Sequence, residues 1–179
     1  RILSHLSKQK RLNSFFVKNS SHIIYYTRKL RYFIQFLDFI PSITESLGRK
    51  IEPSELKRIF LPLADCKEVT IALLNSNLFF WFFSVYSDVR NVNRREIEAF
   101  PCSIDAMSEE ITTDLRRLCK ALMKDFNDNS KFITNNYGKF GVLTIQSFQP
   151  RLSKPIIDQI DQVLARHYGF TDEELDFII

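Results

Sequence analysis

The chain has 179 residues, of which 45% are hydrophobic, and a net charge of +4; this is enough apolar sequence for one folded core. Only 4 glycines are present, which disfavours a fold built on glycine-rich phosphate loops, and Cys66, Cys102 and Cys119 lack metal-ligand spacing, which indicates reduced thiols in a cytoplasmic protein. We find no signal peptide and no apolar run of about 18 residues, so we expect no membrane span.

Short apolar runs alternate with polar sequence in the first sixty residues. Residues 1–13 are typical of the end of a helix, and the β-branched and aromatic run His22–Thr27 predicts a strand. The apolar run 32–40 favours a second strand, although its periodicity leaves a helix open. An exposed loop is expected over 42–53, and the sequence of Leu56–Leu61 predicts another short strand.

The segment 73–101 changes abruptly from apolar to cationic sequence. Six consecutive apolar residues, including Trp81, are followed within a few positions by a cluster of arginine and asparagine. We expect a central helix over 67–86, with polar residues 75–77 marking a bend or a change of element, and a helical turn over 94–100. A buried element would thus present a cationic loop at the surface.

Helices dominate the prediction for the second half. The apolar period predicts one helix over 108–125, capped by Ser108, and another over 153–167. Gly169 suits a left-handed C-terminal cap, and Thr171 with Glu174 forms a capping box for a last helix. Between these helices we expect a polar loop over 127–141 and a short strand over 142–145.

Charge is distributed unevenly along the chain. Residues 1–95 contain 16 Lys and Arg against 7 Asp and Glu, whereas residues 96–179 contain 9 against 14. A basic first half favours an anionic partner, most commonly nucleic acid, although a solvated basic face would give the same count.

Basic, aromatic and amide residues form clusters that suit contacts with DNA. Arginine can contact guanine or phosphate through two hydrogen bonds, and asparagine can contact adenine in the same way. In the alternative reading one tyrosine packs inward, and Arg94 and Arg95 pair with nearby glutamates. The candidate DNA contacts are Tyr25, Tyr26, Arg28, Lys29, Arg31, Arg49, Lys50, Lys57, Arg58, Arg90, Asn91, Asn93, Arg94 and Arg95.

Motifs for catalysis are sparse. Nucleotide-binding, hydrolase and zinc-protease signatures do not occur. Asp65-Cys66-Lys67 matches the D-x-K core of metal-dependent nucleases, but Glu55-Leu56-Lys57 matches the related E-x-K pattern equally well. Two matches to so short a pattern indicate chance, so a nuclease is the least favoured function and no catalytic residue or metal ligand is assigned.

Four stretches together resemble the C-terminal part of large bacterial adenine-specific DNA methyltransferases of type II and IIG restriction–modification systems. The resemblance extends from about residue 22 to the end of the chain, and its last two stretches are the most specific. The stretches are HIIYYTRKLRYFIQFLDFIP, SELKRIF, LLNSNLFFWFFSVYSDVRNVNRREIEAFP and KPIIDQIDQVLARHYGFTDEELDFII.

This resemblance implies that catalysis and DNA recognition belong to different domains. In the family, an upstream Rossmann-like domain binds S-adenosylmethionine, and its Pro-Pro loop holds a flipped adenine; this sequence has neither. The catalytic domain and its cofactor are therefore expected upstream, and this chain, which looks like a piece of a longer protein, is expected to hold no cofactor. Residues 87–98 match the family's polar stretch after the buried helix. This stretch would either contact bases or phosphates or form a structural turn.

We therefore expect a mixed α+β fold similar to the recognition domain of a type I specificity subunit. A β-containing basic recognition region, 1–105, would precede a helical segment, 106–179, packed on it. The expected function is DNA target recognition for an adenine-specific methyltransferase, with duplex DNA and the upstream domain as partners. The alternative is a protein-interaction module whose acidic helices dock on another domain or subunit.

Overall fold

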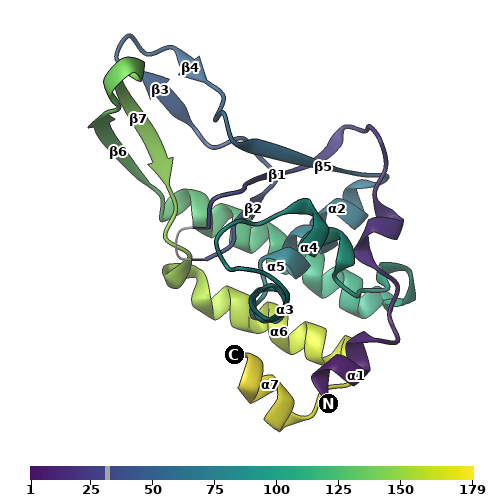
Figure 1. Ribbon diagram of the computed structural model, residues 1–179. Helices are drawn as coiled ribbons and strands as arrows, with labels where there is room; N and C mark the ends of the chain where they lie inside the picture. The colour runs from purple at the N-terminus through teal and green to yellow at the C-terminus, as the bar shows by residue number, and fades with distance from the viewer. Residues whose placement is uncertain (31–32) are drawn as a thin grey trace.

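Helices and two separate antiparallel sheets make up the protein, which confirms the expected α+β class (Figure 1). The computed structural model describes residues 1–30 and 33–179. The smaller sheet has the order β2-β1-β5, formed by Phe36–Leu37, His22–Thr27 and Leu56–Leu61. Both longer strands have the predicted bounds, whereas the described part of the apolar run 32–40, residues 33–40, contributes only the two residues of β2.

One face of the small sheet packs on helix α2 (Ala64–Leu74) because alternate residues of its strands are apolar. Ile24 on β1 lies opposite Ile59 on β5, and both side chains are fully buried. The other face carries Tyr25 opposite Arg58. The buried face of the sheet thus holds β1 on the core, and the opposite face presents polar side chains.

The helix predicted over 67–86 is two helices, α2 and α3 (Asn77–Tyr86), which meet at 65°. Asn75 ends α2 by turning its amide to strand β2. The amide accepts from the Phe36 backbone N–H at 3.0 Å and donates to the Phe36 and Ile71 carbonyls at 2.8 and 2.9 Å. Ser76 then caps α3 by accepting from the backbone N–H of Phe79 at 3.0 Å. The polar interruption in the sequence is therefore a change of element.

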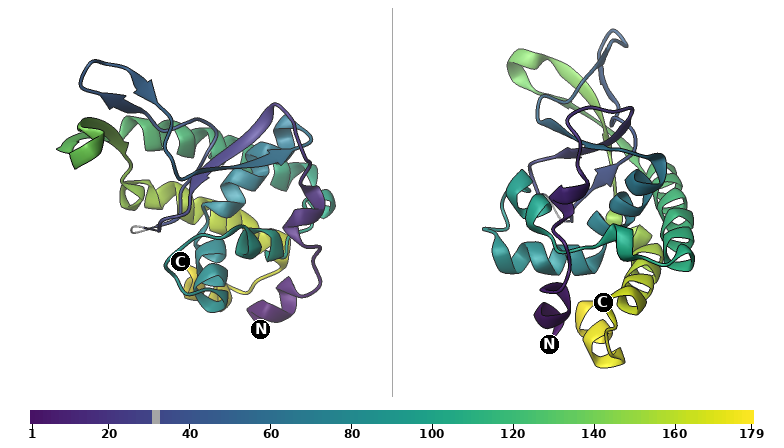
Figure 2. Two further views of the ribbon diagram at one scale, coloured as in Figure 1. Left: turned by 45° about the horizontal axis from the view of Figure 1, so that its top comes forward. Right: turned by 90° about the vertical axis from the view of Figure 1, so that its right-hand side faces the viewer.

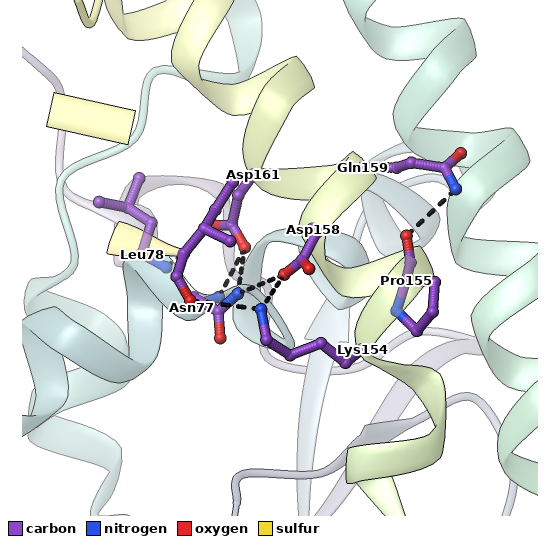
Figure 3. A network of polar contacts seen from close by, with 8 residues as sticks. Asn77, Leu78, Lys154, Pro155, Asp158, Gln159 and Asp161 are labelled. Atoms are coloured by element: carbon purple, nitrogen blue, oxygen red, sulfur yellow. Dashed lines mark hydrogen bonds and ion pairs between the residues drawn. The ribbon is translucent and has the colours of Figure 1, made fainter. Parts of the chain in front are cut away.

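A buried carboxylate fixes the start of α3 on helix α6 (Lys154–Tyr168), as Figure 3 shows. Asp161 accepts hydrogen bonds from the backbone N–H groups of Asn77 and Leu78, both at 3.0 Å, and from the Asn77 side chain at 2.9 Å. Burial nevertheless raises the pKa of Asp161 to about 7, with the three donors acting in the opposite direction.

The long helices of the second half have the predicted caps. The Ser108 side chain accepts from the backbone N–H of Ile111, Gly169 is left-handed, and the capping box of Thr171 and Glu174 is complete. One apolar core joins the two halves, with α5 (Glu109–Asp128) packed on α2 and α6. The remaining helices are α1 (Ile2–Leu6), α4 (Arg94–Ala99) and α7 (Asp172–Ile178), and the short 3₁₀ turns are η1 (Leu12–Phe15), η2 (Ile104–Ala106), η3 (Gly138–Phe140) and η4 (Pro150–Ser153).

A second sheet projects from the body as an arm, which the sequence did not predict (Figures 1 and 2). It is made of two hairpins from distant parts of the chain, in the order β4-β3-β7-β6, and we call it the β-arm. The loops predicted over 42–53 and 127–141 were therefore wrong, whereas the short strand predicted over 142–145 is confirmed as part of β7. The strands are β3 (Ile43–Glu45), β4 (Lys50–Ile51), β6 (Lys131–Asn136) and β7 (Val142–Ser147).

Within the described residues, no single helix is long and apolar enough to cross a membrane. The bent pair α2–α3 reaches the required length and composition only when both helices are counted together. Most of its apolar side chains are buried in the protein core, and this accounts for its composition.

Candidate nucleic-acid interface

Backbone pairing brings together two basic clusters that are some sixty residues apart in the sequence. The Val92 N–H donates to the Arg28 carbonyl at 2.8 Å, and the Leu30 N–H donates to the Arg90 carbonyl at 3.4 Å. Lys29 and Asn91 form an antiparallel bridge between these bonds. The end of β1 and the segment 90–93 therefore make one continuous edge.

The side chain of Asn93 on this edge bonds to the protein itself. Asn93 Oδ1 accepts from the Arg28 guanidinium at 3.3 Å, and Asn93 Nδ2 donates to the Asn91 carbonyl at 3.3 Å. Asp88 accepts from the backbone N–H of Arg90 at 3.0 Å, so it holds the turn and does not pair with the Arg90 guanidinium. These contacts favour a structural role for Asn93 in shaping the edge.

The two tyrosines of β1 have different environments. Tyr25 lies on the open face, with the Arg58 guanidinium 5.6 Å from its ring centre. Tyr26 is buried against Phe36, with ring centres 5.2 Å apart. Burial raises the pKa of the Tyr26 hydroxyl, and the charges of Arg94 and Arg28 oppose that shift. One tyrosine thus packs inward, as the alternative reading of the pair proposed.

Four of the candidate arginines have carboxylate partners. Arg94 bonds to Glu98 at 2.6 Å, Arg95 bonds to the buried Glu96 at 2.9 Å, and Arg58 bonds to Glu52 at 2.6 Å. Arg49 contacts Glu45 through two hydrogen bonds, of 2.9 and 3.0 Å. Their charge is largely balanced within the protein, so they are weaker candidates for phosphate contacts.

Other candidate cations are exposed and lack such a partner. In the part of the chain that the structure describes, no carboxylate lies within 4.0 Å of these side chains. Four of them lie near the end of β1. Arg28 and Lys29 directly follow β1, Lys57 lies on β5 opposite Tyr26, and Arg90 belongs to the segment that pairs with residues 28–30. We call this set the cationic strip. Their uncompensated charge is what an anionic ligand would meet first.

The remaining candidates lie elsewhere. Arg49 and Lys50 belong to the β3–β4 hairpin of the β-arm and not to the cationic strip. Arg31 lies outside the described residues. The sequence therefore grouped residues that the structure divides between two surfaces.

Asp65 of the nuclease-like pattern forms an ion pair in the structure. Arg116 on α5 donates to Asp65 at 2.8 Å and to Glu68 at 3.0 Å, which joins α5 to α2. Among residues 1–30 and 33–179, no group of three or more His, Cys, Asp or Glu side chains is arranged to hold a metal ion. Asp65 is thus accounted for as part of a helix–helix contact.

Sequence reasoning missed the β-arm as a candidate surface, although a signal for it existed. Between Asp128 and Asp158 the sequence has no acidic residue but has four cations, inside a half that is otherwise acidic. The structure pairs this stretch with the 43–51 hairpin from the basic half. Averaging charge over each half of the chain concealed the segment.

We compared the chain with models of known protein families, with curated proteins and with solved structures, and found no match.

Proposed function

We propose that the protein is a DNA target-recognition module that binds duplex DNA through the cationic strip. The observation that carries this proposal is the joining of Arg28 and Lys29 to Arg90 by backbone pairing, which places uncompensated cations on one edge. A row of exposed cations on a rigid edge suits the phosphate backbone, which supplies most of the affinity of such complexes.

The sequence resemblance gives this proposal its biological setting. It implies an adenine-specific methyltransferase of a restriction–modification system, acting in the bacterial cytoplasm. Its upstream domain would bind S-adenosylmethionine and carry out methyl transfer on a flipped adenine. The cationic strip would hold the duplex, and this chain alone would bind DNA without modifying it.

Titration of a fluorescent duplex with the 179-residue chain, followed by anisotropy, tests DNA binding. We expect binding that weakens steeply with salt and a loss of at least tenfold in affinity for the double variant Arg28→Glu/Lys29→Glu. The matched control reverses two exposed cations of α5, Arg117 and Lys124, which already have acidic partners. Equal losses in both double variants, or no binding by the parent chain, would refute the proposal.

A protein-interaction role is the second candidate, and one surface favours it. Leu3 and Phe177, which are 44% and 66% exposed, line a hollow of about 420 Å³ together with Trp81. Aromatic side chains are typical of the centres of interfaces. On this reading the hollow receives another domain or subunit, and Phe177→Ser would abolish that association while leaving DNA binding unchanged.

A further inference from the structure

The β-arm has two chemically different faces, which follow from its strand register. Cross-strand partners point to the same face of a sheet. Pairing across β6, β7, β3 and β4 aligns Ile133, Ile145, Ile43 and Ile51 in one row. The neighbouring row, on the opposite face, contains Thr134, Thr144, Thr44 and Lys50.

The polar face continues along β6. Asn136 lies two residues beyond Thr134 and therefore points the same way. Val142, opposite Asn136, and Phe132, at the other end of β6, are exposed apolar side chains on the same face. The hydroxyl groups of Thr134 and Thr144 are 2.8 Å apart, so they form a cross-strand hydrogen bond. All six residues of β6 are exposed, so no part of the described chain covers this edge strand. The face offers hydroxyl, amide and ammonium groups to a partner.

The charge of the β-arm favours DNA as that partner. The β6–β7 hairpin lies in the stretch between Asp128 and Asp158 that has no acidic residue. The only acid on the other hairpin, Glu45, is neutralised by Arg49, whereas Lys50 has no acidic partner among the described residues. Hydroxyl, amide and ammonium groups are the ones that contact phosphates and base edges.

The dimensions of the β-arm indicate which strands can enter a groove. Strands in a sheet lie about 4.8 Å apart, so two strands match the major groove, which is about 12 Å wide, whereas four do not. The β6–β7 pair forms one edge of the sheet and projects from the body (Figures 1 and 2). Its outer strand and the polar face are thus accessible to a groove.

We propose that the β6–β7 hairpin of the β-arm inserts into a groove of duplex DNA, with the polar face toward the bases. This inference rests on the proposed function and adds a second contact surface to it. The cationic strip grips the backbone, and the hairpin reads sequence through Asn136 and Thr134. Glu52, which follows β4, bonds to Arg58 on β5 at 2.6 Å, and this ion pair joins the end of the β3–β4 hairpin to the small sheet.

Photo-crosslinking from neighbouring positions on β6 tests the orientation. p-Benzoylphenylalanine replaces Thr134 on the polar face or, as the control, Ile133 on the isoleucine face, and the full 179-residue chain is irradiated with a labelled duplex. We expect a protein–DNA adduct from position 134 and little from position 133. Equal yields, an adduct from position 133 alone, or crosslinking to a second copy of the chain from position 134 would overturn the inference.

Alanine variants provide an independent measurement. We expect Asn136→Ala combined with Lys50→Ala to weaken duplex binding about tenfold, and Asn135→Ala, on the opposite face, to change it less than twofold. If the parent chain binds DNA and the strip variants lose binding while both β-arm variants bind normally, only this inference fails. Absence of DNA binding by the parent chain refutes the proposed function and this inference together.

Discussion

Single buried polar side chains determine how the elements of this protein join. Asn75 shows why: its amide takes the place of a neighbouring strand for β2 and at the same time ends α2. Asp161 plays the corresponding part at the start of α3. Sequence patterns indicated an interruption at 75–77, but they could not identify the partners, because Phe36 and Asp161 are distant in the chain.

Replacing Asn75 by alanine should lower the free energy of unfolding by about 3 kcal/mol, because the Phe36 backbone N–H and carbonyl would be left buried without partners. Urea denaturation followed by circular dichroism measures this change. The control Asn19→Ala, at an exposed position, should alter stability by less than about 0.5 kcal/mol. Similar values for the two variants would contradict the role of the buried amide.

Asp161 should make stability depend on pH. Its pKa rises from 3.8 to about 7 on folding, so between these values the folded state keeps a proton that the unfolded state has lost. The stabilising contribution is therefore full below pH 3.8 and is lost as the pH rises to about 7. The slope is at most about 1.4 kcal/mol per pH unit.

Unfolding free energies of the parent and Asp161→Asn, measured in urea from pH 5 to 8, isolate the pH-dependent contribution of Asp161 to stability. Burial lowers the pKa of His167, which gives a slope of opposite sign, but that slope is common to both proteins and cancels in their difference. We expect the variant to be less stable throughout and the difference to shrink as the pH rises. A difference that stays constant with pH would exclude titration of Asp161 in this range.

Whole elements were predictable where local sequence decides them. Caps and apolar periods located α5, α6 and α7, and the β-branched and aromatic runs located β1 and β5. Only part of β7 was predicted in the β-arm. The strands β3 and β4 have only three and two residues, and the two hairpins are held by pairing between residues about a hundred positions apart, such as Ile43 with Ile145. The candidate site was half predicted for the same reason: its residues were named, but their division into strip, ion pairs and β-arm depends on distant contacts.

The turn before the cationic segment has a backbone conformation that its sequence does not favour. Val89 has a φ of 56°, which is unfavourable for a β-branched residue, and the side chain of Ser87 accepts its N–H at 3.1 Å. Asn tolerates this conformation better. We expect Val89→Asn to raise the free energy of unfolding by about 0.5–1 kcal/mol, whereas Val85→Asn, exposed on α3, should lower it. Thermal unfolding compares the two, and destabilisation by Val89→Asn would show that the strain is not relieved.

At the scale of the whole molecule, folding changes the meaning of the charge count. The basic half contains arginines that the fold balances with Glu52, Glu96 and Glu98, and the acidic half contributes an acid-free hairpin to the β-arm. The charge available to an anionic partner is therefore set by the unpaired cations, and a count over the sequence overstates one half and understates the other.

Salt dependence of DNA binding distinguishes paired from unpaired cations. Each phosphate contact that is lost should reduce the slope of log affinity against log salt by about 0.9, so Lys29→Ala/Arg90→Ala should reduce it by about 1.8. Arg94→Ala/Arg95→Ala removes the same formal charge, but these side chains are already bonded to glutamates, so we expect a clearly smaller reduction. Anisotropy titrations of one duplex at four salt concentrations give both slopes. Equal slopes for the two double variants would mean that the ion pairs open on DNA and that Arg94 and Arg95 contact phosphates as well.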